Sequence, residues 1–166
     1  MTPDVILNTY QTWSAEPEKA MGRSSVVATS EGPAAAVTAG SFAWRTDLPS
    51  VLGGGGSAPS PTALLLSALA GCAVVFLRDT LAPLLGVTLR SVQATASCES
   101  DARGLLGLGG AVPDLQNIVL SIAIDSPDPQ EKIDALFAVW RKRCPVYLAL
   151  THEQHVRVSM AVAQAA

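Results

Sequence analysis

The sequence predicts an α+β domain in which antiparallel sheet is covered by helices. Three observations carry this prediction: a long uncharged run in the middle of the chain, alternating apolar and polar residues on both sides of it, and an amphipathic segment near the carboxyl end. The predicted order is strands, a long buried helix, more strands, a second helix and a final strand. Grouped strands and helices in this order are typical of an antiparallel sheet with helices packed on it.

The length and composition indicate one domain with a hidden apolar surface. The chain has 166 residues, which is enough to bury a core and short enough for a single domain over residues 1–166. We expect residues 1–20 to form an extension and the core to cover about residues 22–162. Hydrophobic residues make up 49% of the chain and charged residues only 15%. A partner subunit is therefore expected to cover part of the surface, and a homo-oligomer is predicted.

Charge and the amino-terminal sequence argue against several classes of protein. The net charge of −3, with scattered lysines and arginines, offers no basic field for a nucleic-acid backbone. Residues 1–20 carry four charged side chains and lack the apolar core of a signal peptide. We therefore expect a cytoplasmic, reducing compartment, where cysteine pairs are more often catalytic or metal-binding than structural.

The apolar run at residues 63–77 is predicted to be a buried core helix and not a membrane span. It has fifteen residues without a charge, whereas about twenty are needed to cross the hydrocarbon layer. Ser60 can cap the helix with Pro61 in its first position, and Pro83 marks the other end. The helix is predicted over about residues 61–82. Its side chains are apolar all round, so we expect sheet and the same helix of another subunit to cover it.

Short apolar runs on both sides of this helix predict strands. Those before the helix lie at residues 26–28, 36–38 and 41–45, and those after it at residues 92–98, 118–124 and 156–162. Cys98, on the first of the later strands, is most simply a small core residue. The glycine-rich segment 53–57 is expected to be a flexible linker, because no phosphate-binding fingerprint accompanies it.

The second helix is predicted to begin with Asp128 as its N-cap and Pro129 in its first position. Its apolar stripe continues four residues past Trp140 to Cys144, which therefore faces the core. Pro145 then forces a break or a new turn.

Cys72 and Cys144 are the candidate redox residues. They lie 72 residues apart in the sequence, so only the fold can pair them. The thiolate is the reactive form, and its usual pKa of about 8.5 is lowered by nearby cations and raised by apolar burial. Cys72 lies about 16 Å from the start of its helix, which is too far for the helix dipole to help. It needs an arginine; without one it is an inert buried cysteine.

Gly71, next to the first of these cysteines, is unusual in the middle of a helix. Glycine costs about 1 kcal/mol there relative to alanine and usually marks the close approach of another group. A helix crossing at this position is one explanation.

Two segments resemble those of OsmC/Ohr proteins. The run from Ser57 to Cys72 resembles the segment that ends in the family's first cysteine, and Arg143-Cys144-Pro145-Val146 resembles its second cysteine motif. Residues 101–104 and the strand at residues 115–124 are also similar, so the resemblance covers about residues 22–162. It implies an intertwined homodimer with two long central helices packed together, antiparallel sheets outside them and an active site at each subunit interface.

The resemblance also implies thiol peroxidase activity toward organic hydroperoxides. Cys72 matches the peroxidatic cysteine, which becomes a sulfenic acid, and Cys144 matches the resolving cysteine, which condenses with it to a disulfide. The family arginine, which lowers the pKa of the thiol and polarises the peroxide, matches Arg23 best and Arg45 second. No cofactor or metal is expected; the reductant is an external thiol or dithiol, a lipoyl group in some branches of the family.

Thr62 departs from the family pattern. The family's peroxidases hold the arginine with a glutamate ten residues before the first cysteine, and a neutral hydroxyl cannot form that salt bridge. Glu31 and Asp47 are candidate substitutes. The departure supports a second hypothesis, an OsmC-fold protein with little peroxidase activity that binds a small apolar ligand at the dimer interface.

His152 and His155 are the other residues that could hold a ligand. They lie three residues apart, but Glu153 is the only nearby carboxylate, so a surface turn is favoured over a metal site.

Overall fold

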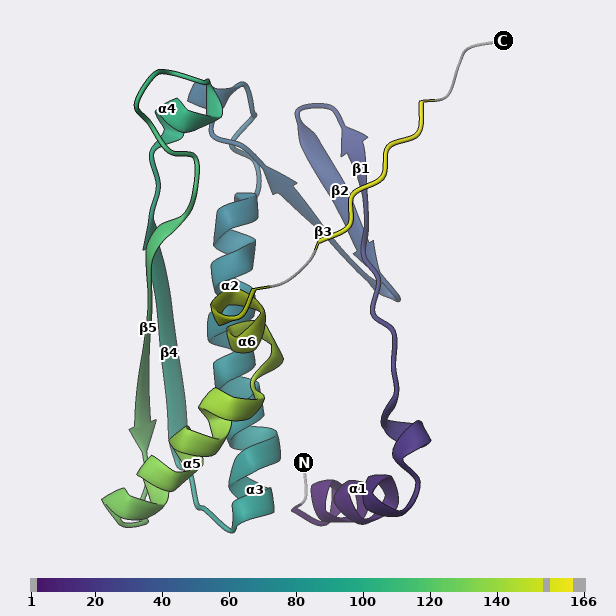
Figure 1. Ribbon diagram of the computed structural model, residues 1–166, viewed down its shortest axis with the longest axis vertical. Coiled ribbons are helices and arrows are strands. Elements are labelled where there is room, and N and C mark those ends of the chain that lie inside the picture. The colour runs from purple at the N-terminus through teal and green to yellow at the C-terminus, as the bar shows by residue number, and fades with distance from the viewer. Residues whose placement is uncertain (1–2, 154–155, 163–166) are drawn as a thin grey trace.

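The computed structural model describes residues 3–153 and 156–162 of the chain. A long central helix and a second helix lie on one face of a two-stranded antiparallel sheet, while a three-stranded sheet and an amino-terminal helix lie beside this body (Figure 1). In chain order the elements are α1 (Pro3–Ala15), η1 (Pro17–Ala20), β1 (Val27–Glu31), β2 (Ala34–Ala39), β3 (Phe42–Asp47), η2 (Ser50–Leu52), α2 (Pro61–Val75), η3 (Phe76–Leu81), α3 (Ala82–Leu85), β4 (Ser91–Glu99), α4 (Ala102–Leu105), β5 (Gln116–Asp125), α5 (Gln130–Arg143) and α6 (Pro145–Thr151). The predicted α+β class is confirmed.

The central helix begins as its sequence predicts and runs slightly further. The Ser60 hydroxyl accepts a hydrogen bond from the Ala63 amide, and Pro61 occupies the first turn. The helix passes through a π-helical segment, η3, and ends in α3 at Gly86, whose φ of +64° favours glycine. The wider π turn makes room for the ring of Pro83, so this proline does not stop the helix where the sequence predicted.

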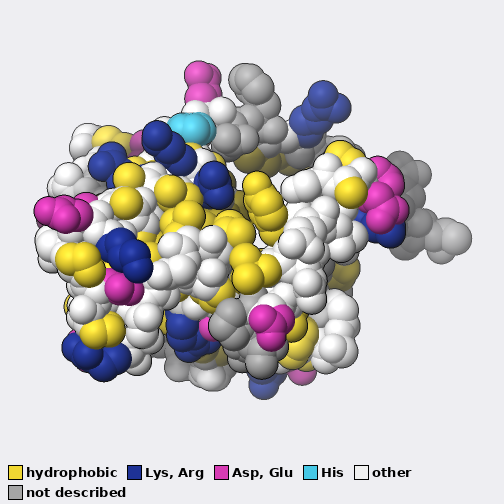
Figure 2. All heavy atoms as spheres, turned by 90° about the horizontal axis from the view of Figure 1, so that it is seen from below, with side chains coloured by type: hydrophobic (Ala, Val, Ile, Leu, Met, Phe, Trp, Pro, Cys, Tyr) yellow, Lys and Arg dark blue, Asp and Glu magenta, His cyan; other side chains and the backbone are white. Residues whose placement is uncertain are grey.

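One chain covers only one side of the central helix. Leu69, Ala73, Leu77 and Leu81 form its buried stripe, whereas Gly71 is exposed. The span Pro61–Leu85 is long and apolar enough to cross a membrane by length and composition alone. Its most apolar 18-residue window has a mean hydropathy of 1.8, and only 22% of that window is buried. Figure 2 shows hydrophobic side chains in a hollow in the middle of one face of the molecule. The expected cover on every side is therefore incomplete in a single chain.

The two-stranded sheet of β4 and β5 supports both long helices. The strands pair antiparallel from Ser91 opposite Asp125 to Glu99 opposite Gln116. Alternate residues point toward the helices, and the packed ones are Val92, Ala94, Leu120, Ile122 and Ile124. Their neighbours in the sequence are exposed, and all of them except Val119 are polar or small, so the predicted period of two is confirmed.

The second helix begins one residue later than its sequence predicts. Pro129 takes the N-cap position of α5, and the Asp128 carboxylate instead accepts a hydrogen bond from the Thr88 amide at 2.6 Å. The predicted capping role of Asp128 is wrong because the loop before β4 uses that carboxylate. Leu136, Trp140 and Cys144 form the buried stripe as expected.

The last predicted strand is absent from the described residues. Residues 156–162 have no ladder partner, and their alternate side chains Val156, Val158, Met160 and Val162 are 75–89% exposed. A strand needs a neighbour for its backbone hydrogen bonds, and none of the strands in the described part of the chain pairs with this segment. The sequence pattern is that of a strand, but one chain does not pair it.

The amino-terminal strands form the predicted meander, in the order β1-β2-β3. The glycine-rich segment after them is a loop held in place by hydrogen bonds and not the flexible linker that was expected. The Asp47 carboxylate, only 4% exposed, accepts hydrogen bonds from the amides of Leu48, Gly55 and Ser57 and from the Ser57 hydroxyl at 2.7–3.1 Å. These bonds, led by those of Ser57, lower the pKa of Asp47 to about 2. The loop therefore fixes how the chain enters α2.

Gly54 is the most tightly enclosed position of this loop. A Cβ atom there would lie 2.0 Å from the Leu48 carbonyl oxygen and 2.8 Å from an Asp47 carboxylate oxygen. We expect Gly54→Ala to lower the free energy of unfolding by more than about 1 kcal/mol, because backbone must shift. Thermal unfolding followed by circular dichroism measures this change. Gly22→Ala, at a site with nothing within 4 Å, is the matched control and should change stability by less than about 0.5 kcal/mol; equal effects of the two variants would contradict the enclosure.

Candidate active site

The fold brings the two predicted redox cysteines into contact. The Cys144 thiol donates to the Cys72 sulfur across 3.4 Å, although 72 residues separate them in the sequence. Both are free thiols in this structure. A disulfide needs roughly 2.0 Å between sulfurs, so the pair lies close to bonding distance in its reduced form.

Cys144 owes its position to the junction of two helices. Its amide donates to the Trp140 carbonyl at 2.9 Å, and its own carbonyl accepts from the Leu148 amide at 2.9 Å. It therefore closes α5 and opens α6, with extended backbone between them (φ −69°, ψ 112°). Pro145 explains this geometry, because a residue before proline avoids the helical region. The result is a wholly buried thiol directed at α2.

The environment of Cys72 in one chain disfavours its thiolate. Burial, followed by the hydrogen bond and charge interaction with Cys144, raises the pKa of Cys72 to about 11, while a backbone hydrogen bond from Val146 lowers it slightly. No arginine or lysine of the described residues contributes to lowering this pKa. At pH 7 only about one thiol in ten thousand is then ionised.

The structure does not bring the predicted arginines to the thiols within one chain. Arg23 lies exposed in the extended segment before β1. This segment runs on the side of the molecule away from β4 and β5 (Figure 1). Arg45, on β3, pairs with Glu31 at 3.0 Å, and both side chains are about half exposed. The catalytic role of Arg23, or of Arg45, stays a prediction.

The candidate substitutes for the missing family glutamate are both engaged elsewhere. Asp47 organises the glycine-rich loop, and Glu31 holds Arg45. Thr62 lies in the first turn of α2 and lines an apolar cavity of about 790 Å³ together with Cys98. Cys98 is thus half-buried at a cavity wall and not enclosed in the core as expected.

An aromatic cluster packs against Cys144, and the sequence analysis missed it as a unit. The rings of Phe137 and Trp140 stack with centroids 5.4 Å apart, and Tyr147 lies 5.1 Å from Trp140. Trp140 is 1% exposed, and its Nε1 atom has no hydrogen-bond acceptor among the described residues. The sequence spacing could have indicated this cluster, because Trp140 precedes Cys144 by four residues and Tyr147 follows it by three, which are the separations of neighbours on one face of a helix.

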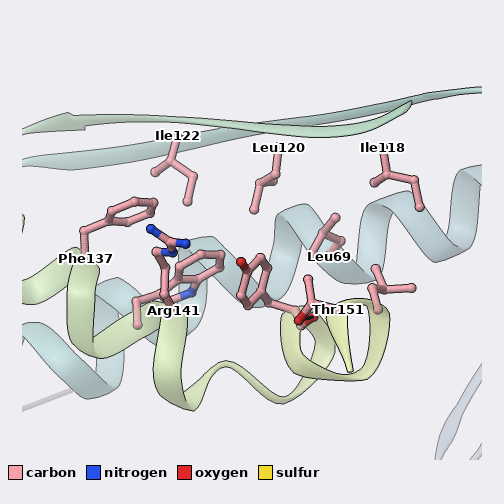
Figure 3. Close-up of a pocket in the computed structure, with 10 residues that line it drawn as sticks. Leu69, Ile118, Leu120, Ile122, Phe137, Arg141 and Thr151 are labelled. Atoms are coloured by element: carbon pink, nitrogen blue, oxygen red, sulfur yellow. Dashed lines mark hydrogen bonds between the residues drawn. The ribbon is translucent and has the colours of Figure 1, made fainter. Parts of the chain in front are cut away.

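A cavity of about 380 Å³ opens beside this cluster (Figure 3). Its lining comes from α2, β5, α5 and α6 and consists of Leu69, Ile118, Leu120, Ile122, Phe137, Trp140, Arg141, Tyr147, Leu150 and Thr151. The walls are mostly apolar, and among the described residues that line the cavity Arg141 alone is charged.

One of the two histidines of the predicted pair lies among the described residues. His152 is exposed at the end of α6 and borders a shallow hollow with Lys142, while His155 lies outside the described residues. Over residues 3–153 and 156–162, no three His, Cys, Asp or Glu side chains are grouped to hold a metal ion.

Two cysteines in contact, one on a long apolar helix and one at a helix junction beside an antiparallel sheet, define a thiol-pair protein of the α+β class. The OsmC-like protein family model matches residues 54–159, a range that contains both thiols. The chain therefore belongs to the OsmC-like protein family.

Solved structures share this fold at low sequence identity. An OsmC-like protein from Mycoplasma pneumoniae superposes with a TM-score of 0.65 and 22% identity, covering 78% of this chain and 88% of that one. An organic hydroperoxide resistance protein OsmC from Legionella pneumophila gives a TM-score of 0.52 at 22% identity, covering 78% and 90%. One from Elizabethkingia anophelis gives 0.55 at 18%, covering 78% and 88%. No protein among the curated sequences matches the chain.

Proposed function

We propose that this protein is a thiol-dependent peroxidase that reduces organic hydroperoxides. The observation that carries the proposal is the 3.4 Å contact between the sulfurs of Cys72 and Cys144. Membership of the OsmC-like family and the fold shared with hydroperoxide resistance proteins support a peroxidase-like or stress-related role.

The chemistry follows from the order of burial of the two thiols. Cys72, the more accessible sulfur, attacks the terminal oxygen of the hydroperoxide as its thiolate. The O–O bond breaks, the alcohol leaves with a proton, and Cys72 becomes a sulfenic acid. The Cys144 sulfur then attacks the sulfenic sulfur, and a disulfide forms as water is released. Two reducing equivalents from an external dithiol, in a reducing cytoplasmic compartment, restore both thiols.

The test is a thiol titration after stoichiometric alkyl hydroperoxide. Loss of two thiols per chain, with an intramolecular disulfide between residues 72 and 144 in the peptide map, is expected. Hydroperoxide that leaves both thiols titratable would overturn the proposal.

We further propose that the active form is a homodimer. The central helix is mostly uncovered in one chain. Within the described residues, the segment 156–162 has the pattern of a strand but no strand partner, and no cation lowers the pKa of Cys72. A second copy supplies all three missing elements: an apolar face, a strand neighbour and an arginine, for which Arg23 is the first candidate and Arg45 the second.

Gly71 tests the pairing of the two central helices. A Cβ atom at this exposed helix position meets nothing within 4 Å of a single chain, so Gly71→Leu should not disturb the monomer fold. If helices cross there, the leucine separates them, and we expect the dimer dissociation constant to rise at least tenfold, which is about 1.4 kcal/mol. Sedimentation equilibrium measures this change. Arg103→Ala, on the exposed short helix α4, is the control, and dimerisation that is equally strong in Gly71→Leu would exclude a crossing at this residue.

A second candidate function is a binding protein with little peroxidase activity. It is favoured by the raised pKa of Cys72 and by Thr62, which lines the 790 Å³ apolar cavity at the start of α2. In this alternative a small apolar ligand binds at the dimer interface. Rapid hydroperoxide turnover with a dithiol reductant would exclude it.

A further inference from the structure

The cavity of 380 Å³ beside the aromatic cluster has the features of a small-ligand site. Its volume lies in the range of about 300–1,000 Å³ that is usual for such sites. Aliphatic side chains from α2 and β5 form one wall, and Phe137, Trp140 and Tyr147 form the other. Figure 3 shows Leu120 and Ile122 facing this cavity from the sheet and Leu69 from the helix. A wall of this kind suits an alkyl chain.

One cation reaches into this apolar space. Figure 3 shows the Arg141 side chain extending from α5 alongside Phe137, with its guanidinium toward Ile122. None of the ion pairs found within the described part of the chain involves Arg141. The guanidinium of an arginine that makes no ion pair can bind a carboxylate in bidentate geometry, through two parallel N–H donors.

The surroundings of Arg141 are positive although the protein carries a net charge of −3. A neighbouring hollow of about 440 Å³ shares Arg141, Tyr147 and Thr151 with the cavity and adds Lys142 and His152. No aspartate or glutamate lies among the described residues that line these two hollows. The charge at the mouth therefore favours an anionic group over a neutral or cationic one.

From these observations we infer that the cavity binds a small amphiphilic carboxylate. The alkyl chain lies between the sheet side chains and the aromatic cluster, and the carboxylate accepts hydrogen bonds from the Arg141 guanidinium. This site is separate from the apolar cavity at the start of α2, and ligand binding there needs no redox chemistry. The ligand contacts Trp140 and Tyr147, which flank Cys144 in sequence and pack against it.

Isothermal titration calorimetry of the full-length reduced protein with octanoate tests the inference. Saturable binding of one octanoate per chain is expected. The neutral analogue 1-octanol should bind at least about tenfold more weakly, because it leaves the guanidinium without its charged partner. Arg141→Leu, which keeps the apolar body of an exposed side chain, should weaken octanoate binding by a similar factor and leave 1-octanol binding unchanged.

Arg143→Leu is the matched control, because Arg143 lies on the same helix end but lines neither hollow. It should bind octanoate within about twofold of the unmodified protein. Cys72→Ser should also bind normally, which separates this inference from the proposed peroxidase. Three outcomes would each overturn the carboxylate-binding inference. They are equal affinity for octanoate and 1-octanol, unchanged octanoate binding in Arg141→Leu, and no binding at millimolar octanoate because a second copy fills the cavity.

Discussion

One equivalent of an alkyl hydroperoxide is expected to remove two of the three thiols of the reduced protein and to leave Cys98 titratable. The sulfurs of Cys72 and Cys144 are already 3.4 Å apart, so the sulfenic acid formed on Cys72 can react with Cys144 without a large movement of the chain. Cys98 lines a separate cavity and takes no part. Counting thiols under denaturing conditions, followed by peptide mapping, measures the outcome.

Three serine variants divide this reaction into its steps. Cys72→Ser should retain both remaining thiols after peroxide, since the attacking sulfur is gone. Cys144→Ser should lose one thiol and accumulate a sulfenic acid, which a dimedone adduct detects by mass. Cys98→Ser is the control and should lose both thiols as the unmodified protein does. Peroxide-driven thiol loss in Cys72→Ser would show that the assignment of Cys72 as the attacking residue is wrong.

The second large effect is expected in the pH dependence of Cys72 alkylation. In a dilute single chain the pKa of this thiol is about 11, raised mainly by burial. The rate with iodoacetamide should then rise about tenfold per pH unit from pH 7 to pH 10, because only the thiolate reacts. The free energy of unfolding, in contrast, should fall as the pH rises. The folded protein binds the Cys72 proton more tightly than the unfolded chain does, so this contribution to stability is lost as the pH rises from the unfolded pKa of 9.0 toward the folded pKa of about 11.

In the proposed dimer, an arginine from the second copy should lower the pKa of the same thiol. A guanidinium within about 4–6 Å favours the thiolate, so the alkylation rate should level off at a much lower pH, with a gain at pH 7 of up to about ten-thousand-fold if ionisation becomes complete. The measurement compares rate profiles below and above the dimer dissociation constant, with N-acetylcysteine as the reference thiol. A profile that rises to pH 11 at every protein concentration would contradict the peroxidase proposal and favour the binding protein.

The central helix and its cysteine could be predicted because their signals are local. Ser60 and Pro61 mark the start of α2, and apolar alternation identifies β4 and β5. The approach of Cys72 to Cys144 was implied by the family resemblance, and spacing alone would not have given it. The structure adds that Pro145 opens a new helix and that this turn buries Cys144.

Other features depend on contacts that no local pattern encodes. The sequence of the glycine-rich segment 53–57 is typical of a flexible linker. In the structure Asp47, at the end of β3, accepts hydrogen bonds from three donors of this segment, which are the Gly55 amide, the Ser57 amide and the Ser57 hydroxyl. Asp128 reads as a helix cap, but its carboxylate binds Thr88, forty residues earlier. The alternating pattern of residues 156–162 predicts a strand, and this prediction is wrong for the described single chain, because a strand also needs a neighbour for its backbone hydrogen bonds and no described strand pairs with this segment.

The position of Cys144 between two helices limits how far the polypeptide must move during an oxidation cycle. Its backbone bonds to Trp140 and Leu148 hold α5 and α6 on either side, while only its side chain lies against Cys72. Joining the sulfurs requires an approach of little more than 1 Å, which rotation about side-chain bonds can provide. The oxidised and reduced proteins should therefore share one backbone conformation. A reductant would then have to reach the disulfide without any unwinding of α5 or α6.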